Sequence, residues 1–205
     1  AYEILIGLVG AEMCIRDRFK VTCLAASPRS AGKTYTEAVG NRWAMTAPMP
    51  ENLKDMMVYD AVADIDTIVS KVDFVFCAVD MKKDEIKAFE EMYAKHECPV
   101  VSNNSAHRFT ADVPMVIPEL NPEHLDVIEA QRKRLGTKRG FVAVKSNCSL
   151  QSYVPALFPL DKEFGVEKCL VCTYQAISGA GKTFERWPEM VDNVCLLYTS
   201  PSPRD

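Results

Sequence analysis

The residue best suited to chemistry is Cys148, which lies in the stretch VAVKSNCSLQSYVPALFPL, residues 142–160. An apolar, β-type run leads into Ser146 and Asn147, and a helical pattern follows the cysteine. At the first turn of a helix, unpaired backbone N–H groups and the positive end of the helix dipole favour the thiolate. The same N–H groups could stabilise the oxyanion that forms when a thiolate attacks a carbonyl group. The position therefore predicts a nucleophilic thiol, against the alternative of a small buried hydrophobe.

A second pair of thiols, Cys169 and Cys172, has the C-x-x-C spacing of some zinc and redox sites. The pair lies inside an apolar, β-type run, KCLVCTYQAISG (168–179), and no second pair accompanies it. We interpret the spacing as incidental and predict no metal site. The remaining cysteines receive a structural interpretation or none: Cys14, Cys23, Cys77, Cys98 and Cys195.

Between its two ends the chain alternates between β-type runs and helical patterns. DFVFCAV is almost continuously apolar, as a strand covered on both faces of a parallel sheet should be. In KKDEIKAFEEMYAKHE (82–97) the large apolar residues share one helical face. NPEHLDVIEAQRKRLG has a helix-start signal at Asn121 and Pro122 and a stop at Gly136. The expected strands are FKVTCLAAS (19–27), DFVFCAV (73–79), CPVVSN (98–103) and GFVAVKSN (140–147).

Strands separated by helices of this length indicate βαβ units and an α/β fold with a parallel sheet. In open sheets of this kind, ligands bind beyond the carboxyl ends of the strands. This rule selects four loops that we expect to crowd one edge: SPRSAGK (27–33), DMKK (80–83), SNNSAHR (102–108) and SNCS (146–149). Their polar side chains suit phosphates and acyl groups, with ordinary solvated loops as the alternative. The candidates are Ser27, Arg29, Ser30, Lys33, Asn103, Ser105, Arg108 and Cys148.

Composition limits the class of protein. The chain has 205 residues, of which 48% are hydrophobic, so it can bury a sizeable core in one large domain, or in one domain and part of another. A net charge of −4 argues against a general attraction to nucleic acid or to an anionic membrane. No apolar run approaches the ~20 residues of a membrane span, and the first residues lack a signal-peptide pattern. We expect a cytoplasmic protein whose eight cysteines are reduced thiols.

Two terminal segments do not match the rest of the chain. EMCIRDR (12–18) and CLLYTSPSPRD (195–205) look like translated sequencing-adapter read-through. A natural tail rich in Ser and Pro is the alternative for the C-terminal segment alone. We exclude both segments from the fold reasoning and treat residues 1–18 and 195–205 as non-native-looking ends.

Six motifs, in order along residues 19–194, resemble the aspartate-semialdehyde dehydrogenase family, in the branch found in archaea, fungi and some bacteria. They are LAASPRSAGK, SNNSAHR, PELNPEHL, SNCSLQSYVPAL, TYQAISGAGKTF and WPEMVDNV. The resemblance implies NADPH-dependent reduction of aspartyl 4-phosphate to aspartate 4-semialdehyde with release of phosphate, on the route to lysine, threonine and methionine. It also implies an incomplete, Rossmann-like NADP-binding domain over residues 19–147. The start of an α+β catalytic and dimerisation domain follows over residues 148–194, and the parent enzyme is expected to be a homodimer or homotetramer.

The resemblance assigns roles to individual positions. Cys148 matches the family nucleophile, which forms a thioacyl intermediate, and Gln175 matches the residue that orients the substrate at this cysteine. Arg108 matches a phosphate-binding arginine, and Asn103 lies beside it. A cation and hydroxyls after the second strand of such a sheet favour NADP over NAD. The positions implied to contact the cofactor are Ser27, Arg29 and Ser30 at its 2′-phosphate, and Gly179 and Gly181 in a turn that approaches the ligands closely.

The sequence departs from the family pattern at both ends. Where the family has a strand and a GATGxVG loop, this chain has AYEILIGLVGAEMCIRDR, with only Gly7 and Gly10, so the pyrophosphate cradle is missing or replaced. The family's general acid/base histidine and a substrate-binding arginine lie beyond the point where CLLYTSPSPRD begins. His96, His107 and His124 do not occupy that motif. We expect an internal fragment of an enzyme gene that is inactive alone.

Three alternatives remain open. Malonyl-CoA reductase shares this fold branch and the cysteine chemistry. The fragment could instead be a nucleotide-binding module without turnover. Finally, it could be a metal-binding or interaction protein that uses the C-x-x-C pair.

Overall fold

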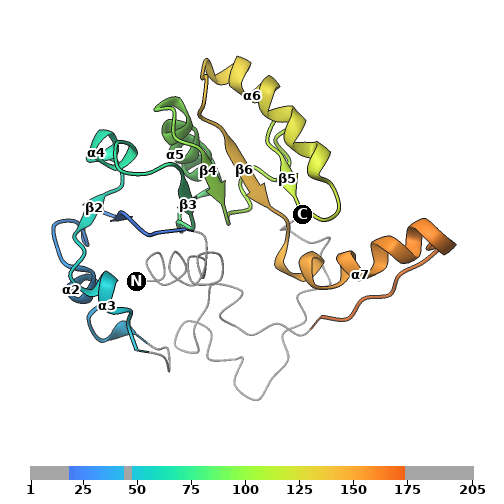
Figure 1. Cartoon of the computed structure of the whole chain (residues 1–205), viewed down its shortest axis with the longest axis horizontal. Coiled ribbons are helices and arrows are strands. Elements are labelled where there is room, and N and C mark those ends of the chain that lie inside the picture. Colours follow the sequence, from blue (N-terminus) through green and yellow to red (C-terminus); the bar gives the residue numbers. More distant parts are fainter. Residues whose placement is uncertain (1–18, 44–47, 174–205) are drawn as a thin grey trace. The chain divides into compact units, whose positions relative to one another are not determined.

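The computed structural model describes residues 19–43 and 48–173 (Figure 1). The chain divides into two compact units, Ala1–Asn147 and Cys148–Asp205. The first unit contains every described strand, and the helix α7 (Cys148–Phe164) is the described helix of the second.

The centre of the first unit is a four-stranded parallel sheet. Its strands are β3 (Val75–Cys77), β4 (Val100–Ser102), β5 (Met115–Val116) and β6 (Val142–Lys145), in the order β3-β4-β6-β5. Val75 pairs with Val100, which in turn pairs with Val142. β-branched valine side chains in neighbouring strands therefore form a row across the sheet. Such side chains pack well on the pleated surface of a sheet.

Helices cross between the strands of this sheet. Helix α5 (Lys83–Lys95) links β3 to β4, and η2 (Pro122–Val127) with α6 (Ile128–Leu135) links β5 to β6. Both helices were predicted from the sequence. The second begins as a 3₁₀ helix at Pro122 and ends at Gly136, whose φ of 74° is the left-handed conformation that glycine adopts without a steric cost.

A separate two-stranded parallel sheet precedes the four-stranded one. It consists of β1 (Leu24–Ala26) and β2 (Val58–Asp60). Between these strands lie α2 (Tyr35–Val39), η1 (Gly40–Arg42) and α3 (Glu51–Lys54), and α4 (Ile65–Val69) leads on to β3. This part has its own core, in which Tyr35, Leu53 and Val58 are buried. The two sheets therefore have distinct hydrophobic clusters.

An apolar groove with a volume of about 460 Å³ lies between β1 and β3. Three aromatic rings are among the side chains that line it. The Phe19 ring centroid lies 5.1 Å from that of Phe74, which lies 5.1 Å from that of Phe76. Their edge-to-face geometry is the one that aromatic pairs favour.

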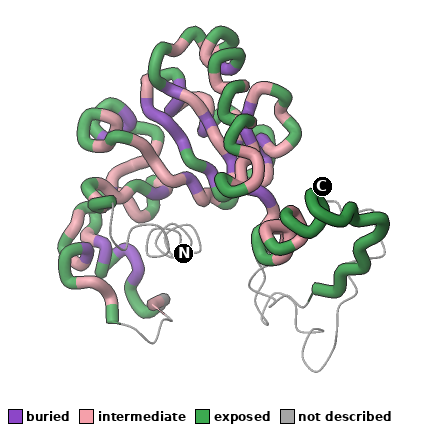
Figure 2. Tube along the Cα trace, turned by 45° about the vertical axis from the view of Figure 1, so that its right-hand side comes forward, coloured by how far each residue is buried: buried purple, intermediate pink, exposed green. Residues whose placement is uncertain are grey.

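The predicted α/β class and parallel sheet are confirmed, but the strands are shorter than the apolar runs that indicated them. The apolar, β-type run at residues 168–179 forms no strand in the part that is described. Residues 168–173 are exposed and form no strand, and Leu170 is fully exposed. An apolar run becomes a strand only where a neighbouring strand can accept its hydrogen bonds, and no described residue pairs with this segment. Figure 2 shows burial concentrated along the strands of the first unit.

The turn after α5 fixes where β6 begins. Glu97 has a positive φ of 60°, and its carboxylate accepts backbone N–H groups of Lys138, Arg139 and Gly140 at 2.6 to 3.1 Å. A Cβ at Gly140 would lie 1.8 Å from the carbonyl oxygen of Ala94, so only glycine fits there. These hydrogen bonds lower the pKa of Glu97 to about 2, and the bond from Gly140 has the largest effect.

We predict that Glu97→Gln destabilises the fold at neutral pH and that the difference disappears in acid. The folded-state pKa of Glu97 lies below its ordinary value of 4.5, so its stabilisation is complete above that value and is lost as the pH falls toward 2. Urea unfolding midpoints of the two proteins should differ most near about pH 7 and converge only as the pH falls to about 2. A midpoint difference that does not change with pH would contradict this role.

Candidate functional site

The loops that follow β3, β4 and β6 meet at the carboxyl edge of the four-stranded sheet. The N–H of Asn103, after β4, donates to the carbonyl of Cys77 at the end of β3 at 2.8 Å. Nη2 of Arg108 donates to the carbonyl of Ser146, after β6, at 3.4 Å. The side chain of Asn103 is exposed, and Arg108 is half-buried. The sequence prediction that these loops share an edge is therefore confirmed for this sheet.

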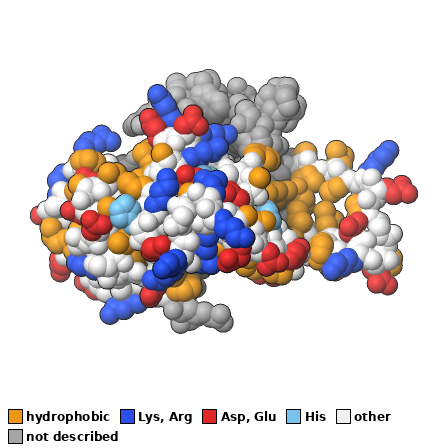
Figure 3. All heavy atoms as spheres, turned by 90° about the horizontal axis from the view of Figure 1, so that it is seen from above, with side chains coloured by type: hydrophobic (Ala, Val, Ile, Leu, Met, Phe, Trp, Pro, Cys, Tyr) orange, Lys and Arg blue, Asp and Glu red, His pale blue; other side chains and the backbone are white. Residues whose placement is uncertain are grey.

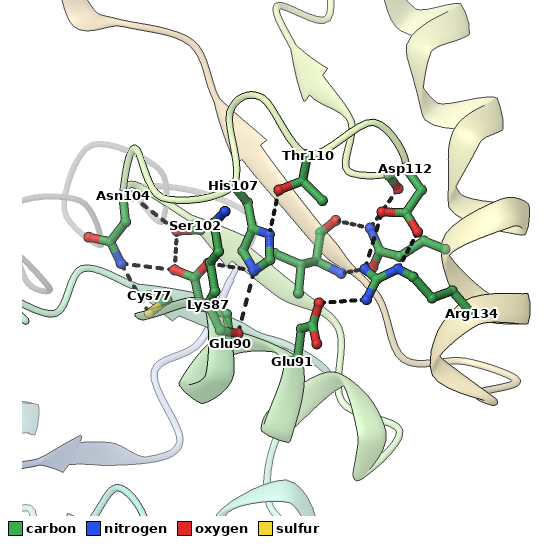
Figure 4. A network of polar contacts seen from close by, with 12 residues as sticks. Cys77, Lys87, Glu90, Glu91, Ser102, Asn104, His107, Thr110, Asp112 and Arg134 are labelled. Atoms are coloured by element: carbon green, nitrogen blue, oxygen red, sulfur yellow. Dashed lines mark hydrogen bonds and ion pairs between the residues drawn. The ribbon is translucent and has the colours of Figure 1, made fainter. Parts of the chain in front are cut away.

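A buried carboxylate holds the loop after β4. Glu90, on α5, is fully buried, and its Oε1 accepts Ser102 Oγ at 2.5 Å and Asn104 Nδ2 at 2.9 Å (Figure 4). Ser102 Oγ also accepts the N–H of Asn104 at 3.0 Å. Asn104 donates in addition to Cys77 Sγ at 3.4 Å. Burial is the main cause that raises the pKa of the Cys77 thiol, and the nearby charge of Glu90 raises it further. Cys77 is therefore expected to stay protonated.

His107 completes this buried cluster. Its Nε2 lies 3.4 Å from the carbonyl of Lys87 and 4.0 Å from Glu90 Oε2, and its Nδ1 lies 3.1 Å from Thr110 Oγ1. Because a carbonyl can only accept, we assign the ring proton to Nε2, and Nδ1 then accepts from the hydroxyl. Burial lowers the pKa of His107, against the opposing effect of Glu90, which agrees with a neutral ring.

The far end of the same loop is tied to α6. Arg134 binds both carboxylate oxygens of Asp112, at 2.5 and 3.1 Å, and also Glu91 of α5 at 2.7 Å. Gln131 is buried and donates to the carbonyls of Asp112 and Val142. The N–H of Val142 returns a bond to Gln131 Oε1 at 2.6 Å. The loop that carries Asn103 and Arg108 is thus fixed at both ends by polar side chains (Figure 4).

The loop after β1 forms a turn against β2. The carbonyl of Ser27 accepts the N–H of Ser30 at 2.9 Å, and the N–H of Gly32 donates to the carbonyl of Val58 at 2.9 Å. Lys33 Nζ donates to the Arg29 carbonyl at 2.9 Å, and the Arg29 side chain is exposed. Ser27, Arg29 and Ser30 are therefore brought together, as predicted, but on the two-stranded sheet.

Cys148 is the first residue of α7 and is exposed, in agreement with the predicted helix start. It begins the second unit. The other candidates C-terminal to it, Gln175, Gly179 and Gly181, lie outside the described residues. Cys169 and Cys172 are exposed free thiols.

The charged surface is mixed. Figure 3 shows Lys and Arg side chains interspersed with Asp and Glu over the first unit on the face seen from above. Within residues 19–43 and 48–173, no group of three or more His, Cys, Asp or Glu could hold a metal ion. No helix in the same ranges has the length and apolar character to cross a membrane.

Sequence reasoning missed Glu90. The signal was its spacing, because Glu90 lies four residues after Ile86 and three before Tyr93, both of which are buried on the same face of α5. An acidic residue inside an apolar stripe indicates a buried carboxylate with partners of its own.

The open parallel sheet, with its polar loops at the carboxyl edge, defines the class as an α/β protein of the nucleotide-binding type. Residues 7–128 match the family model described as semialdehyde dehydrogenase, NAD binding domain. The chain belongs to this family.

Curated relatives and solved structures agree with this assignment. The aspartate-semialdehyde dehydrogenase of Aspergillus fumigatus is 37% identical over 199 residues, covering 92% of this chain and 53% of the relative. That of Methanothermobacter thermautotrophicus is 37% identical over 190 residues, covering 86% and 51%. The crystal structure of the Candida albicans enzyme with NADP gives a TM-score of 0.61 at 33% identity, covering 80% of this chain and 44% of that chain. The chain spans about half the length of the curated relatives it matches.

We predict that Glu90→Ala lowers the free energy of unfolding by about 2 to 4 kcal/mol, because it leaves buried donors unpaired and opens a cavity. Glu90→Gln keeps an acceptor and most of the volume and should cost less. Hydrogen exchange at residues 103–110 should accelerate in Glu90→Ala. The exposed Glu119→Ala is the control and should stay within about 0.5 kcal/mol of the parent. Equal stability of Glu90→Ala and the control would rule out this anchoring role.

Proposed function

We propose that this chain is part of an enzyme that reduces aspartyl 4-phosphate to aspartate 4-semialdehyde with NADPH and releases phosphate. The single observation that carries the proposal is Cys148 as the exposed first residue of a helix, after the last parallel strand, in a chain of the semialdehyde dehydrogenase family. The relatives named aspartate-semialdehyde dehydrogenase support the choice of substrate.

Cys148 is the proposed nucleophile. Its thiolate attacks the acyl carbon of the acyl phosphate, the bond to the phosphate oxygen breaks, and inorganic phosphate leaves with the electron pair. A thioester on Cys148 remains. Backbone N–H groups at the start of α7 can donate to the oxyanion that forms during the attack. After reduction, the carbon–sulfur bond breaks, the thiolate is regenerated and the aldehyde departs. Gln175 is the proposed residue that orients the substrate.

Arg108 and Asn103 are proposed to bind phosphate. The side chain of Arg108 lies at the carboxyl edge of the sheet, where Ser146 also lies. A guanidinium matches two phosphate oxygens with parallel N–H donors, which gives both charge and orientation. The Glu90 cluster holds the loop before substrate arrives, so less ordering is needed on binding.

The turn after β1 is proposed to hold the 2′-phosphate of NADP. Arg29 offers an exposed cation, and Ser27 and Ser30 offer hydroxyls on one tight turn, a donor set that suits a phosphate monoester. When bound, NADPH supplies the hydride for the reduction. Gly179 and Gly181 are proposed to allow a close approach of the backbone to the ligands.

Six of the eight cysteines lie in the described ranges, and none of these six forms a disulfide. This supports a reducing compartment, which we propose to be the cytoplasm. We further propose that the parent enzyme is a homodimer or homotetramer and that this 205-residue chain turns over poorly alone. General acid/base help is typically worth about 100- to 10,000-fold, and His107, buried and neutral, is bound to structural partners instead.

The proposed nucleophile predicts that Cys148 is the most reactive thiol of the chain. Limiting iodoacetamide followed by peptide mass spectrometry should label Cys148 before Cys169 and Cys172. These two are matched controls because they are exposed, as Cys148 is, but do not lie at the start of a helix. Faster labelling of either control would remove Cys148 from this role.

The proposed cofactor site predicts that Arg29→Ala weakens NADPH binding by about 1.5 to 3 kcal/mol, because a charge-assisted bond to the 2′-phosphate is lost. NADH lacks this phosphate and serves as the internal control, since its Kd should stay unchanged. Fluorescence titration of the reduced nucleotides measures both. An unchanged ratio of the two Kd values would exclude Arg29 from the cofactor site.

A further inference from the structure

Strand β5 is an outer strand of the four-stranded sheet (Figure 1). Among the described strands it pairs with β6 alone. On its inner side, the N–H of Val144 donates to the carbonyl of Pro114 at 2.9 Å. Each residue of a strand turns both of its backbone groups to one side, and the side alternates along the chain. Met115 and, directly after the strand, Ile117 therefore turn their backbone groups away from β6, where a strand of another chain could pair with them.

Two side chains of this chain occupy that outer side. Asn121 Oδ1 accepts the N–H of Ile117 at 2.8 Å, and Asn121 Nδ2 donates to the carbonyl of Met115 at 3.0 Å. The carboxamide thus makes the two bonds that a peptide group of a further strand would make. His124 Nδ1 lies 3.2 Å from the backbone N and 3.1 Å from the carbonyl oxygen of Met115. Because that carbonyl already accepts from Asn121, we assign Nδ1 as the acceptor of the Met115 N–H.

The turn that follows β5 holds both side chains beside it. The N–H of Asn121 donates to the carbonyl of Ile117 at 3.1 Å, and the N–H of His124 donates to the carbonyl of Asn121 at 3.1 Å. Pro122 starts η2 between them, where its fixed φ favours the start of a helix. His124 lies only nine residues after Met115. The chain therefore folds back along the edge that it has just formed, and this arrangement needs no distant segment.

The segment offers little other protection against strand pairing. Residues 114–118, PMVIP, have no charged side chain, whereas exposed edges are commonly protected by charges, bulges or a covering element. Apolar, β-prone segments without charge pair readily with copies of themselves. The two prolines bound the segment but leave the outward groups of Met115 and Ile117 unchanged. Protection of these groups therefore depends on Asn121 and His124.

We propose that Asn121 and His124 form an edge guard, which takes the place of a further strand on β5 and prevents a second copy of this chain from pairing there. A second copy is the partner to be excluded, because two β5 edges are identical and can pair antiparallel about a two-fold axis. The proposal does not depend on the reaction proposed above.

The double variant Asn121→Ala/His124→Ala removes the edge guard. Its self-association, measured by analytical ultracentrifugation, should be tighter than that of the unmodified chain by at least about tenfold, because Met115 and Ile117 then need new partners. Hydrogen exchange at the amides of Met115 and Ile117 should be fast in the dilute variant and slow in the associated one. Glu119→Ala, at an exposed position on the same turn, is the matched control and should associate as the unmodified chain does.

Two further measurements separate strand pairing from partial unfolding. Adding Met115→Pro to the double variant removes an outward N–H without removing a bond to β6, and it should restore the association of the unmodified chain. Cys98, buried in the core of the four-stranded sheet, should resist alkylation throughout. If the double variant exposes Cys98, Asn121→Ala alone takes its place. Unchanged association of a folded variant, or tight association that persists with Met115→Pro, would overturn the proposal.

Discussion

The carboxylate of Glu90 is the contact on which the candidate site depends. It is fully buried, and it binds the last residue of β4 and the loop that follows. A buried carboxylate is costly unless its oxygens have partners. Ser102 and Asn104 donate to Oε1, and His107 Nε2 lies 4.0 Å from Oε2, which has no hydrogen-bond partner among the described residues. This requirement links helix α5 to the conformation of the loop that carries Arg108. Packing in the core and geometry at the site are therefore not independent properties of this fold.

Parallel pairing is the second constraint. Parallel strands end at one edge, so the sheet itself gathers the loops after β3, β4 and β6, and no loop has to fold back over the domain. Among the described strands, β1 and β2 pair only with each other, and an apolar groove lies between β1 and β3. The turn with Arg29 and the loop with Arg108 therefore lie on different sheets.

The sequence was sufficient where local signals were strong. The amphipathic pattern of α5, the stop at Gly136 and the helix start at Cys148 were all predictable, because caps and periodicity are set by neighbouring residues. It was insufficient where the outcome depends on distant partners. β2 and β5 are two or three residues long and leave almost no periodic signal. The apolar run at residues 168–173 lacks a neighbouring strand among the described residues and forms none.

The site itself was predictable in part. Asn103, Arg108 and the Ser27–Ser30 turn were selected by their position after strands, and the structure brings each group to a carboxyl end. Glu90 was missed because a single glutamate on a helix is ordinarily exposed, and its burial follows from Ser102 and Asn104, which are distant in the sequence. The roles of Gln175, Gly179 and Gly181 stay predictions, since these residues lie outside the described ranges.

A titration of the isotopically labelled chain with inorganic phosphate, followed by amide chemical shifts, tests the proposed phosphate site at Arg108 directly. Saturable shifts should be concentrated at Asn103–Arg108 and Ser146, where the Glu90 cluster fixes the loop, and Arg108→Gln should abolish them. Glu90→Ala should weaken the binding without moving the site, because it loosens the loop and leaves the guanidinium in place. Shifts spread over the surface, or saturation that is unchanged in Arg108→Gln, would contradict a phosphate site at this edge of the sheet.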